Sequence, residues 1–485
     1  MYIGIDIGTS SVKSLLIDDA QRIIGSASEA LAVSRPQPGW SEQDPEAWIA
    51  ATFATLDALA AAHPAAMAAV TGIGLSGQMH GATVLGADDR PLRPAILWND
   101  GRSAAECAAM EANEPRLRAI AGNVAAPGFT APKLLWLAAH EPDVFAAMRT
   151  VLLPKDYVRL HLTGEKVSEM SDAAGTLWLD VAGRRWSDDL LAATGMTRDQ
   201  MPRLVEGTEL SGRLRPELSR RFGIDGSPVV AGGGGDNAAS AVGMGTVTPG
   251  SAFVSLGTSG VLFVSNASYS PNTDGGVHAF CHAVPGTWHQ MGVILSATDS
   301  LNWLAGLLKT PAADLTAALG DSVSGPSPVT FLPYLSGERT PHNDAAARGA
   351  FLGLGHEADA KLMTQAVLEG VGFAFRDCLR VLADAGTTVT RASAIGGGSR
   401  SKLWLQIMAD ILDLPLDVPQ DGDFGGAFGA ARLGLIAATG ADFTSVATPP
   451  PTAFVTEPDA GRARAYADRY ARYRALYPAI KEALN

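Results

Sequence analysis

The stretch IGIDIGTSSVKSLLI at residues 3–17 recurs in outline as AFVSLGTSGVLFVS at residues 252–265. In both stretches a run of β-branched and apolar residues leads to Gly-Thr-Ser, and a second such run follows. This pattern predicts a β-hairpin with a small, hydroxylated tip. The two tips lie about half the chain length apart. Because a duplicated unit would supply one equivalent hairpin to each half, the repeat predicts an α/β fold with two similar lobes.

Two glycine-rich turns support this fold class. SPVVAGGGG at residues 227–235 precedes a predicted helix over Asp236–Met244, and SAIGGG at residues 393–398 precedes apolar residues at helical spacing. A strand, a glycine turn and a helix N-terminus together present backbone N–H groups to phosphate or ribose. The spacing between the two turns differs from the spacing between the hairpins. We therefore predict that the turns are not equivalent elements of the repeat.

The boundary between the lobes is predicted at Gly245–Pro249, between a helix end and the second hairpin. It divides the chain into an N-terminal lobe of residues 1–244 and a C-terminal lobe of residues 245–485. Elsewhere, apolar residues at helical spacing predict amphipathic helices. Helices are expected over Asp44–Leu59, Thr364–Leu382 and Arg462–Leu484, with a Pro-rich linker at Thr448–Thr452.

Composition excludes several classes of protein. A chain of 485 residues favours two or three domains. The 37 Lys and Arg residues against 50 Asp and Glu residues give a net charge of -13, which opposes nucleic-acid binding but not a local ATP site. Three scattered cysteines exclude a disulfide framework. Neither a signal peptide nor an apolar run long enough for a membrane span is evident, so we expect a cytoplasmic protein with no membrane partner.

Two other patterns resemble sites but are better explained structurally. Gly72–Gly77 fits G-x-G-x-x-G, yet the chain after it is predicted to be extended and not helical, which argues against a dinucleotide fold. The P-loop pattern G-x-x-x-x-G-K-[ST] is absent from the sequence. The second pattern is the group His278, Cys281, His282 and His289, which resembles a metal cluster. Side chains alternate between the two faces of a strand, and a Pro-Gly turn follows, so a structural hairpin is favoured over a metal site.

Two carboxylates stand at positions suited to phosphate chemistry. Asp6 precedes the first Gly-Thr-Ser tip, whereas Ser255 holds the equivalent position before the second. Both tips can bind phosphate through amides and hydroxyls, but only the first offers a carboxylate for Mg2+ and its waters. Asp236 follows four glycines at a predicted helix start. Two interpretations of Asp236 stay open: a helix N-cap, or a general base or metal partner in a cleft.

Together these motifs resemble those of FGGY carbohydrate kinases. DIGTS at residues 6–10, GGGDN at 233–237, SLGTSG at 255–260 and GGGSRS at 396–401 occur in the order seen in that family. The resemblance covers nearly the whole chain, through about Gly434. Further matching stretches are WSEQDPEAW (40–48), SGQMHGATVL (76–85), RPAILWNDGR (93–102), PGFTAPKLLWL (127–137), LLPKDYVRL (152–160), MSDAAGTLWLDV (170–181) and PYLSGERTPHN (333–343).

The resemblance implies two actin-like (ribonuclease H-like) lobes flanking a deep cleft for ATP and sugar. It implies phosphorylation of D-xylulose at its terminal hydroxyl, giving D-xylulose 5-phosphate and ADP with Mg2+ as cofactor. Within the same family, ribulokinase or pentitol kinase activity is the alternative. Two other classes share parts of the pattern. An actin-like ATPase switch would have the phosphate hairpins but no counterpart to the QMHG and GGDN segments found here, and a catalytically silent sugar sensor would lack Asp236, which is present. A homodimer is also expected.

The resemblance assigns roles residue by residue. Asp236 matches the catalytic base and Asp6 the residue that supports Mg2+, with Asp236 as the second metal partner. The sugar-binding set is Gln78, Met79, His80, Asp236 and Asn237. The expected phosphate-binding residues are Gly8, Thr9, Ser10, Lys13, Gly257, Thr258 and Ser259, and the expected adenosine loop is Gly396, Gly397, Gly398 and Ser399.

Overall fold

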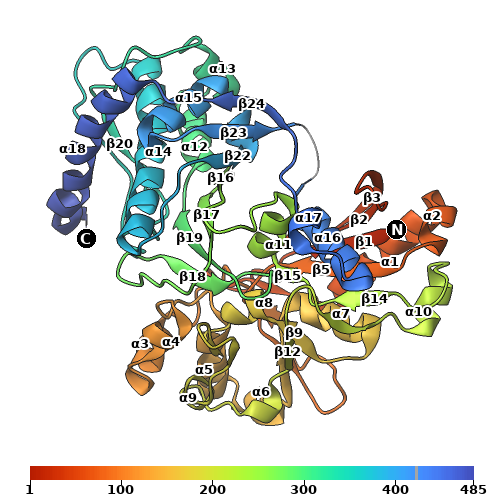
Figure 1. Cartoon of the computed structure of the whole chain (residues 1–485). Helices are drawn as coiled ribbons and strands as arrows, with labels where there is room; N and C mark the ends of the chain where they lie inside the picture. Colours follow the sequence, from red (N-terminus) through yellow and green to blue (C-terminus); the bar gives the residue numbers. More distant parts are fainter. Residues whose placement is uncertain (421–423, 485) are drawn as a thin grey trace.

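The computed structural model, which describes residues 1–420 and 424–484, has two lobes, each built on a seven-stranded sheet (Figure 1). The first sheet has the order β13 (Leu210–Arg213), β14 (Val229–Ala231), β5 (Gly72–Gly77), β1 (Tyr2–Ile7), β2 (Ser11–Ile17) and β3 (Ile23–Ala30), with β15 (Gly234–Gly235) also on β5. The second has the order β18 (His278–Cys281), β19 (Trp288–Ile294), β17 (Gly260–Asn266), β16 (Ala252–Leu256), β22 (Ala392–Ile395), β23 (Leu416–Pro419) and β24 (Thr452–Thr456).

The two sheets repeat the same arrangement, as the sequence predicts. In the first, β1 pairs antiparallel with β2 and parallel with β5; in the second, β16 pairs antiparallel with β17 and parallel with β22. Asp6 lies opposite Ser76 on β5, and the equivalent Ser255 lies opposite Ile395 on β22. The strand Gly72–Gly77 is therefore the counterpart of β22, an equivalence that the sequence analysis missed. The glycines after β14 and those after β22 occupy different places, as predicted.

The strand β1 shows why each sheet has two different faces. Side chains alternate along a strand, so Ile3, Ile5 and Ile7 enter a core with helix α1 (Pro45–Ala62). Tyr2 faces the opposite side and packs against helix α16 (Gly426–Thr439). Asp44 is the N-cap of α1 and accepts from the backbone N–H of Glu46. The predicted helix over Asp44–Leu59 is thus confirmed.

Helix α16 approaches the first sheet through glycines. A Cβ atom added to Gly4 on β1 would lie 1.8 Å from the carbonyl oxygen of Ala427, and one added to Gly74 on β5 would lie 1.8 Å from that of Ala430. Figure 1 shows α16, in blue, beside the red strands β1 and β5. The lobe boundary at 245–249 stays a prediction, but α16 lies beyond it in sequence and packs on the N-terminal sheet.

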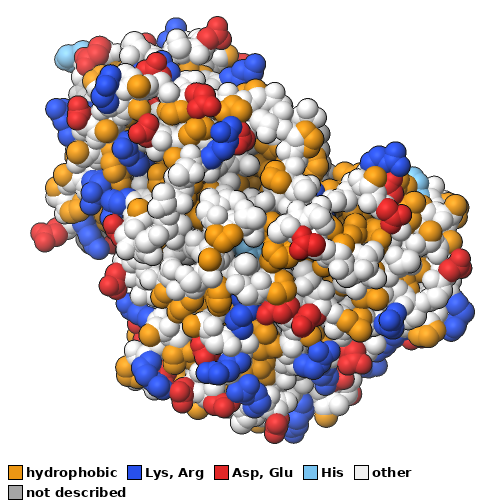
Figure 2. Space-filling model, in the orientation of Figure 1, with side chains coloured by type: hydrophobic (Ala, Val, Ile, Leu, Met, Phe, Trp, Pro, Cys, Tyr) orange, Lys and Arg blue, Asp and Glu red, His pale blue; other side chains and the backbone are white. Residues whose placement is uncertain are grey.

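The C-terminal lobe is built around long helices. Its core lies between the second sheet, α14 (Ala360–Asp384) and α15 (Lys402–Leu412), and the predicted helix over Thr364–Leu382 is confirmed by α14. The terminal helix α18 (Ala460–Leu484) is also confirmed. Over the described part of the chain, every helix is too short or too polar to cross a lipid bilayer. Figure 2 shows acidic and basic side chains interspersed over this face of both lobes.

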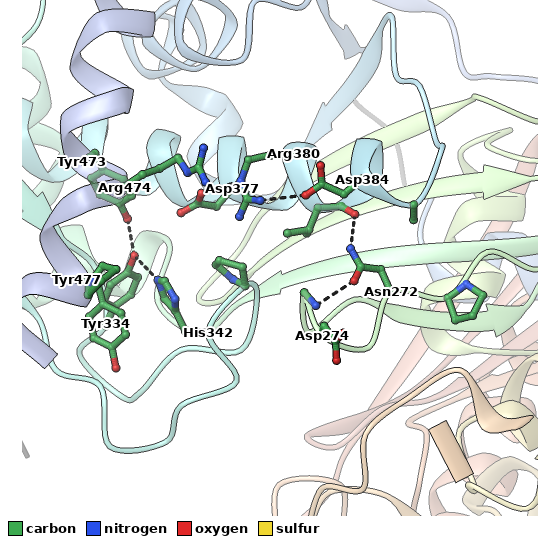
Figure 3. A pocket seen from close by; sticks show the side chains of 16 residues that line it. Asn272, Asp274, Tyr334, His342, Asp377, Arg380, Asp384, Tyr473, Arg474 and Tyr477 are labelled. Atoms are coloured by element: carbon green, nitrogen blue, oxygen red, sulfur yellow. Dashed lines mark hydrogen bonds and ion pairs between the residues drawn. The ribbon is translucent and has the colours of Figure 1, made fainter. Parts of the chain in front are cut away.

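Tyrosine hydroxyls attach α18 to the rest of its lobe. Tyr473 shares a hydrogen bond of 2.9 Å with Tyr334, whose hydroxyl also lies 3.1 Å from His342 Nε2, beside a cavity of about 560 Å³ (Figure 3). The other contacts are Tyr466 to Glu369, Tyr470 to Asp377 and Tyr477 to Asp344, at 2.9, 2.6 and 2.8 Å. These bonds tie α18 to α14 and to the segment 334–344.

The close contact of α16 generates a stability prediction. Gly74→Ala would insert a methyl group into the Ala430 carbonyl, and overpacking of this kind costs about 1–3 kcal/mol or more. Gly306→Ala, at an exposed position of helix α12 (Thr298–Leu308) with nothing within 4 Å of the added atom, is the control and should stabilise by about 0.5–1 kcal/mol. Thermal unfolding of both variants decides: a Gly74→Ala protein as stable as the wild type contradicts the packing described.

Candidate active site

The first hairpin tip is held by side chains from three segments. Gln43 Nε2 donates to the carbonyl oxygen of Thr9 at 2.7 Å, and Trp98 Nε1 donates to Thr9 Oγ1 at 3.0 Å. Gln78 accepts from Thr9 Oγ1 at 3.1 Å, and its Nε2 approaches the carbonyl oxygen of Gly8 at 3.5 Å. Gln78 therefore supports the tip, and its predicted contact with a sugar stays a prediction. Sequence analysis gave no role to Gln43 or Trp98.

Asp6 lies where strand β1 reaches the first tip. Ser76 Oγ donates to Asp6 Oδ1 at 2.7 Å, and Lys13 lies opposite Asp6 in the β1–β2 ladder. A Cβ atom added to Gly426, the first residue of α16, would lie 3.0 Å from Asp6 Cγ. The half-buried carboxylate thus faces a helix N-terminus, where the partial positive charge favours an anion.

Asp236 begins helix α11 (Asp236–Gly243) immediately after the glycine run. Gly233 has a φ of 82°, and a Cβ atom there would lie 2.2 Å from the carbonyl oxygen of Leu75, so only glycine allows this approach to β5. Gly235, and not Asp236, is the N-cap residue, which rules out the N-cap interpretation. Burial, and then the charge of Asp6, raises the pKa of Asp236 to about 6.

The side chain of Asn237 supports the Asp236 carboxylate. Asp236 Oδ1 accepts from the backbone N–H of Asn237 at 2.7 Å and from Asn237 Nδ2 at 2.9 Å. Both bonds favour the ionised carboxylate and therefore oppose the effect of burial on its pKa. The structure thus brings Asp6, Asp236 and Asn237 together in the N-terminal lobe, while the pKa of Asp236 stays close to neutrality.

Met79 and His80 follow β5 and face α8 (Met170–Ala174) and the glycine run. His80 has a φ of 69°, a conformation that residues other than glycine rarely adopt. Its carbonyl oxygen accepts from Lys133 Nζ at 2.8 Å, which helps to hold this conformation. A Cβ atom added to Gly235 would lie 3.0 Å from Met79 Sδ, so the buried Met79 packs directly beside Asp236.

The protonation of His80 follows from its surroundings. Burial lowers the pKa of His80 to about 3, so the ring is neutral at physiological pH. Its Nδ1 lies 2.6 Å from the carbonyl oxygen of Gly175, and because a carbonyl only accepts, Nδ1 carries the proton. Nε2 is then an acceptor. Burial also lowers the pKa of Lys133 to about 7. The sequence analysis gave no role to Lys133.

Beneath the glycine run lies a buried ionic network that sequence analysis quoted within motifs but did not interpret. Lys155 Nζ lies 2.7 Å from Asp156, 3.0 Å from Asp172 and 3.5 Å from Glu169, and all four side chains are fully buried. Arg159 donates to the carbonyl oxygens of Ala231 and Gly232 at 2.6 and 2.5 Å. Helix α7 (Pro154–Thr163) therefore fixes the start of the turn that leads to Asp236.

The C-terminal lobe presents the second hairpin and the predicted adenosine loop together. The carbonyl oxygen of Gly257 accepts from the backbone N–H and Oγ1 of Thr298 at 2.9 and 2.8 Å. Gly396, with a φ of 90°, packs on the backbone of Leu256 at the base of that hairpin. Gly397, Gly398, Arg400 and Thr298 border a cavity of about 820 Å³, a volume typical of a nucleotide-sized ligand, whereas Gly396 and Ser399 are not among its lining residues. At the tip of the second hairpin, Thr258 and Ser259 are exposed. Within the glycine loop, Ser399 Oγ donates to the carbonyl oxygen of Gly396 at 2.8 Å.

Arg339, from the C-terminal lobe, lies near enough to lower the pKa of both His80 and His278. Among the described residues, no cluster of three or more His, Cys, Asp or Glu side chains is suited to a metal ion.

The predicted structural hairpin is confirmed. His278 and Cys281 lie on β18 and His289 lies on β19, and the two strands pair antiparallel.

Comparison with known proteins gives the same class. The N-terminal and C-terminal domain profiles of the FGGY family of carbohydrate kinases match residues 1–243 and 252–438. The chain is 50% identical over 481 residues to the xylulose kinase of Escherichia coli strain K12, with 98% of each chain covered. It is 48% identical over 489 residues to that of Klebsiella pneumoniae, with both chains fully covered.

A solved structure is similar over the full length. The protein described as a xyloylose kinase from Brucella ovis matches with a TM-score of 0.98 and 60% identity, covering 100% of both chains. The duplicated lobes with one Gly-Thr-Ser hairpin each are those of an actin-like phosphotransferase, as the sequence predicts. The chain belongs to the FGGY family of carbohydrate kinases.

The buried network yields a second stability prediction. Lys155→Met would leave three buried carboxylates without their shared cation, and breaking such a pair costs about 3–5 kcal/mol. Burial raises the pKa of Glu169 and of Asp172, so the folded variant binds more protons than the unfolded chain. Its stability should therefore fall as pH rises from 5 to 8.

Urea unfolding at both pH values tests this. The control is Lys166→Met, which removes a partly exposed ion pair with Asp89 and should change stability by about 0–1 kcal/mol. If the two variants lose equal stability at both pH values, the buried network does not stabilise this lobe.

Proposed function

We propose that this chain transfers the γ-phosphoryl group of ATP to the terminal hydroxyl of D-xylulose, giving D-xylulose 5-phosphate and ADP. The observation that carries the proposal is Asp236, a half-buried carboxylate whose pKa burial and the nearby charge of Asp6 raise to about 6, and which directly follows Gly235 where Met79 packs. The substrate class is supported by the names of the Escherichia coli and Brucella ovis relatives.

Asp236 acts as the general base in this reaction. Its carboxylate accepts the proton of the terminal hydroxyl while that oxygen forms a bond to the γ-phosphorus. The bond from the γ-phosphorus to the bridging oxygen breaks, and ADP leaves with the electron pair. A base whose pKa lies near the working pH is ionised and still basic enough to take the proton, and such a group contributes about 100- to 10,000-fold.

The sugar binds beside this base. His80, neutral and protonated on Nδ1, offers Nε2 as an acceptor to a sugar hydroxyl. Met79 forms an apolar wall next to Gly235. Asn237 keeps the Asp236 carboxylate in place and adds an amide to the sugar side. We assign Gln78 to the support of this pocket, because the oxygen and the nitrogen of its side-chain amide contact the first hairpin and Gln43.

ATP binds between the hairpins. Gly8, Thr9, Ser10 and Lys13 from one lobe and Gly257, Thr258 and Ser259 from the other hold its phosphates. The adenosine occupies the cavity beside Gly396–Ser399, where Gly397 and Gly398 leave room for the ligand. The exposed tip residues Ser10, Thr258 and Ser259 are available for such contacts.

Mg2+ fits the carboxylates of the N-terminal lobe. Asp6 and Asp236 lie close enough for the charge of Asp6 to raise the pKa of Asp236. Mg2+ is usually bound by one or two carboxylates together with waters and substrate phosphates, and not by an all-protein cage. Asp6 and Asp236 would hold it. When bound, Mg2+ neutralises charge on the phosphates.

A panel of substrates tests the function. ADP release should be faster with D-xylulose than with D-ribulose or xylitol, and faster turnover of either of those would favour the alternative family activities.

Asp236→Asn keeps the shape but removes the base, so turnover should fall at least about 100-fold. In the wild type, kcat/KM should fall as pH drops through about 6, because Asp236 becomes protonated. Near-normal phosphorylation by Asp236→Asn would refute its role.

A second experiment tests the Mg2+ assignment. Asp6→Asn should raise the Mg2+ concentration needed for half-maximal rate by about 10-fold or more, with the KM for D-xylulose little changed. Ser255→Ala, at the equivalent strand position of the other lobe, is the matched control and should leave the Mg2+ requirement unchanged. Equal Mg2+ titrations for the wild type and Asp6→Asn would show that Asp6 does not support the ion.

A further inference from the structure

One short helix contacts both the base and the sugar-binding histidine. In α8, Ser171 Oγ accepts from the backbone N–H of Gly235 at 3.0 Å, and Gly235 is the residue directly before Asp236. Gly175, which follows the last residue of α8, accepts from Nδ1 of His80 at 2.6 Å. The groups that would activate and bind the sugar hydroxyls are therefore connected through a single five-residue element.

The Ser171 hydroxyl is fully buried and has a fixed direction. It donates to Glu169 Oε1 at 3.0 Å and accepts from Gly235. Glu169 in turn is the N-cap of α8 and accepts from the backbone N–H groups of Ser171 and Asp172 at 2.7 and 2.9 Å. Lys155 lies 3.5 Å from the same Oε1 atom. The hydroxyl lone pair that faces Gly235 is thus set by charged groups that cannot reorient in the core.

The glycine run depends on such outside contacts. Glycine has the greatest backbone freedom of any residue, so four in succession do not fix their own conformation. Gly232 and Gly233 are fixed by backbone bonds to Glu209 and Gly207 at 2.8 and 2.9 Å. For Gly235, the residue that determines where helix α11 starts, the amide is held by Ser171.

We propose that Ser171 is a positioning residue for phosphoryl transfer: by holding the Gly235 amide, it aims the Asp236 carboxylate at the hydroxyl of a sugar bound to His80. This inference rests on the proposed function, since it assigns Ser171 to the base of that reaction. The effect is expected to be large because a displacement of about 1 Å in a catalytic group costs about 100-fold in rate.

The test is Ser171→Ala. We expect kcat to fall about 10- to 100-fold, with the KM for ATP unchanged, because the expected ATP-binding residues lie on other elements. Ser171→Thr keeps the hydroxyl and should recover most of the rate.

The matched control is Ser14→Ala. Ser14 is equally buried, and its hydroxyl lies 2.6 Å from Thr55 Oγ1, so the variant loses a buried hydroxyl without touching the glycine run. Both alanine variants should unfold at similar, lowered temperatures, but only Ser171→Ala should lose kcat. Equal kcat values for Ser171→Ala and Ser14→Ala, or a Ser171→Thr variant whose kcat stays as low as that of Ser171→Ala, overturn the proposal.

Hydrogen exchange separates this inference from the proposed function. Mass spectrometry of the peptide that contains Gly232–Asn237 should show faster exchange in Ser171→Ala than in Ser14→Ala, whichever sugar the enzyme uses. Unchanged exchange overturns the role of Ser171 directly. If exchange accelerates but wild-type protein fails to phosphorylate D-xylulose, the positioning contact stands and the substrate assignment fails.

Discussion

The contact between α16 and the first sheet is the constraint on which the site depends. Carbonyl oxygens of Ala427 and Ala430 occupy the places where side chains of Gly4 and Gly74 would stand. The same helix meets α11 at Gly429, where an added Cβ atom would lie 1.7 Å from the carbonyl oxygen of Ala239. Because α16 touches β1, β5 and α11 at backbone distance, it fixes the relative positions of the elements that carry Asp6 and Asp236. The late part of the chain therefore completes the site of the early part.

Glycine at these positions has a second consequence. With no side chains between α16 and the sheet, the helix N-terminus at Gly426 reaches the carboxylate of Asp6. On the other face of β1, Ile3, Ile5 and Ile7 fill the core with α1. One six-residue strand thus serves a hydrophobic core on one face and an anion-binding helix end on the other. A larger residue at Gly4 would push away the helix and, with it, the partial positive charge that faces Asp6.

Features that depend on local sequence patterns could be predicted. The apolar runs around Gly-Thr-Ser predicted both hairpins, and helical spacing predicted α14. The order of the motifs indicated the family and the position of Asp236 after the glycine run. Contacts between distant residues have no such signature: Ser171 meets Gly235 across 64 positions, and Lys133 meets His80 across 53. The chain after Gly72–Gly77 was predicted to be extended, but Gly72–Gly77 itself was not recognised as the counterpart of β22. Its glycines serve packing against α16, whereas those after β22 border a cavity.

Burial at the site favours the neutral form of both an acid and a base. Burial raises the pKa of Asp236 to about 6 and lowers that of His80 to about 3. The Asp236 carboxylate, the proposed base, is then still mostly ionised at neutral pH, yet more basic than an exposed aspartate. His80 stays neutral, and its Nε2 can accept a hydrogen bond from a hydroxyl group. The buried cation Lys155 lies beneath the glycine run, where it contacts Asp156, Glu169 and Asp172. The positive charge therefore supports the turn that leads to Asp236.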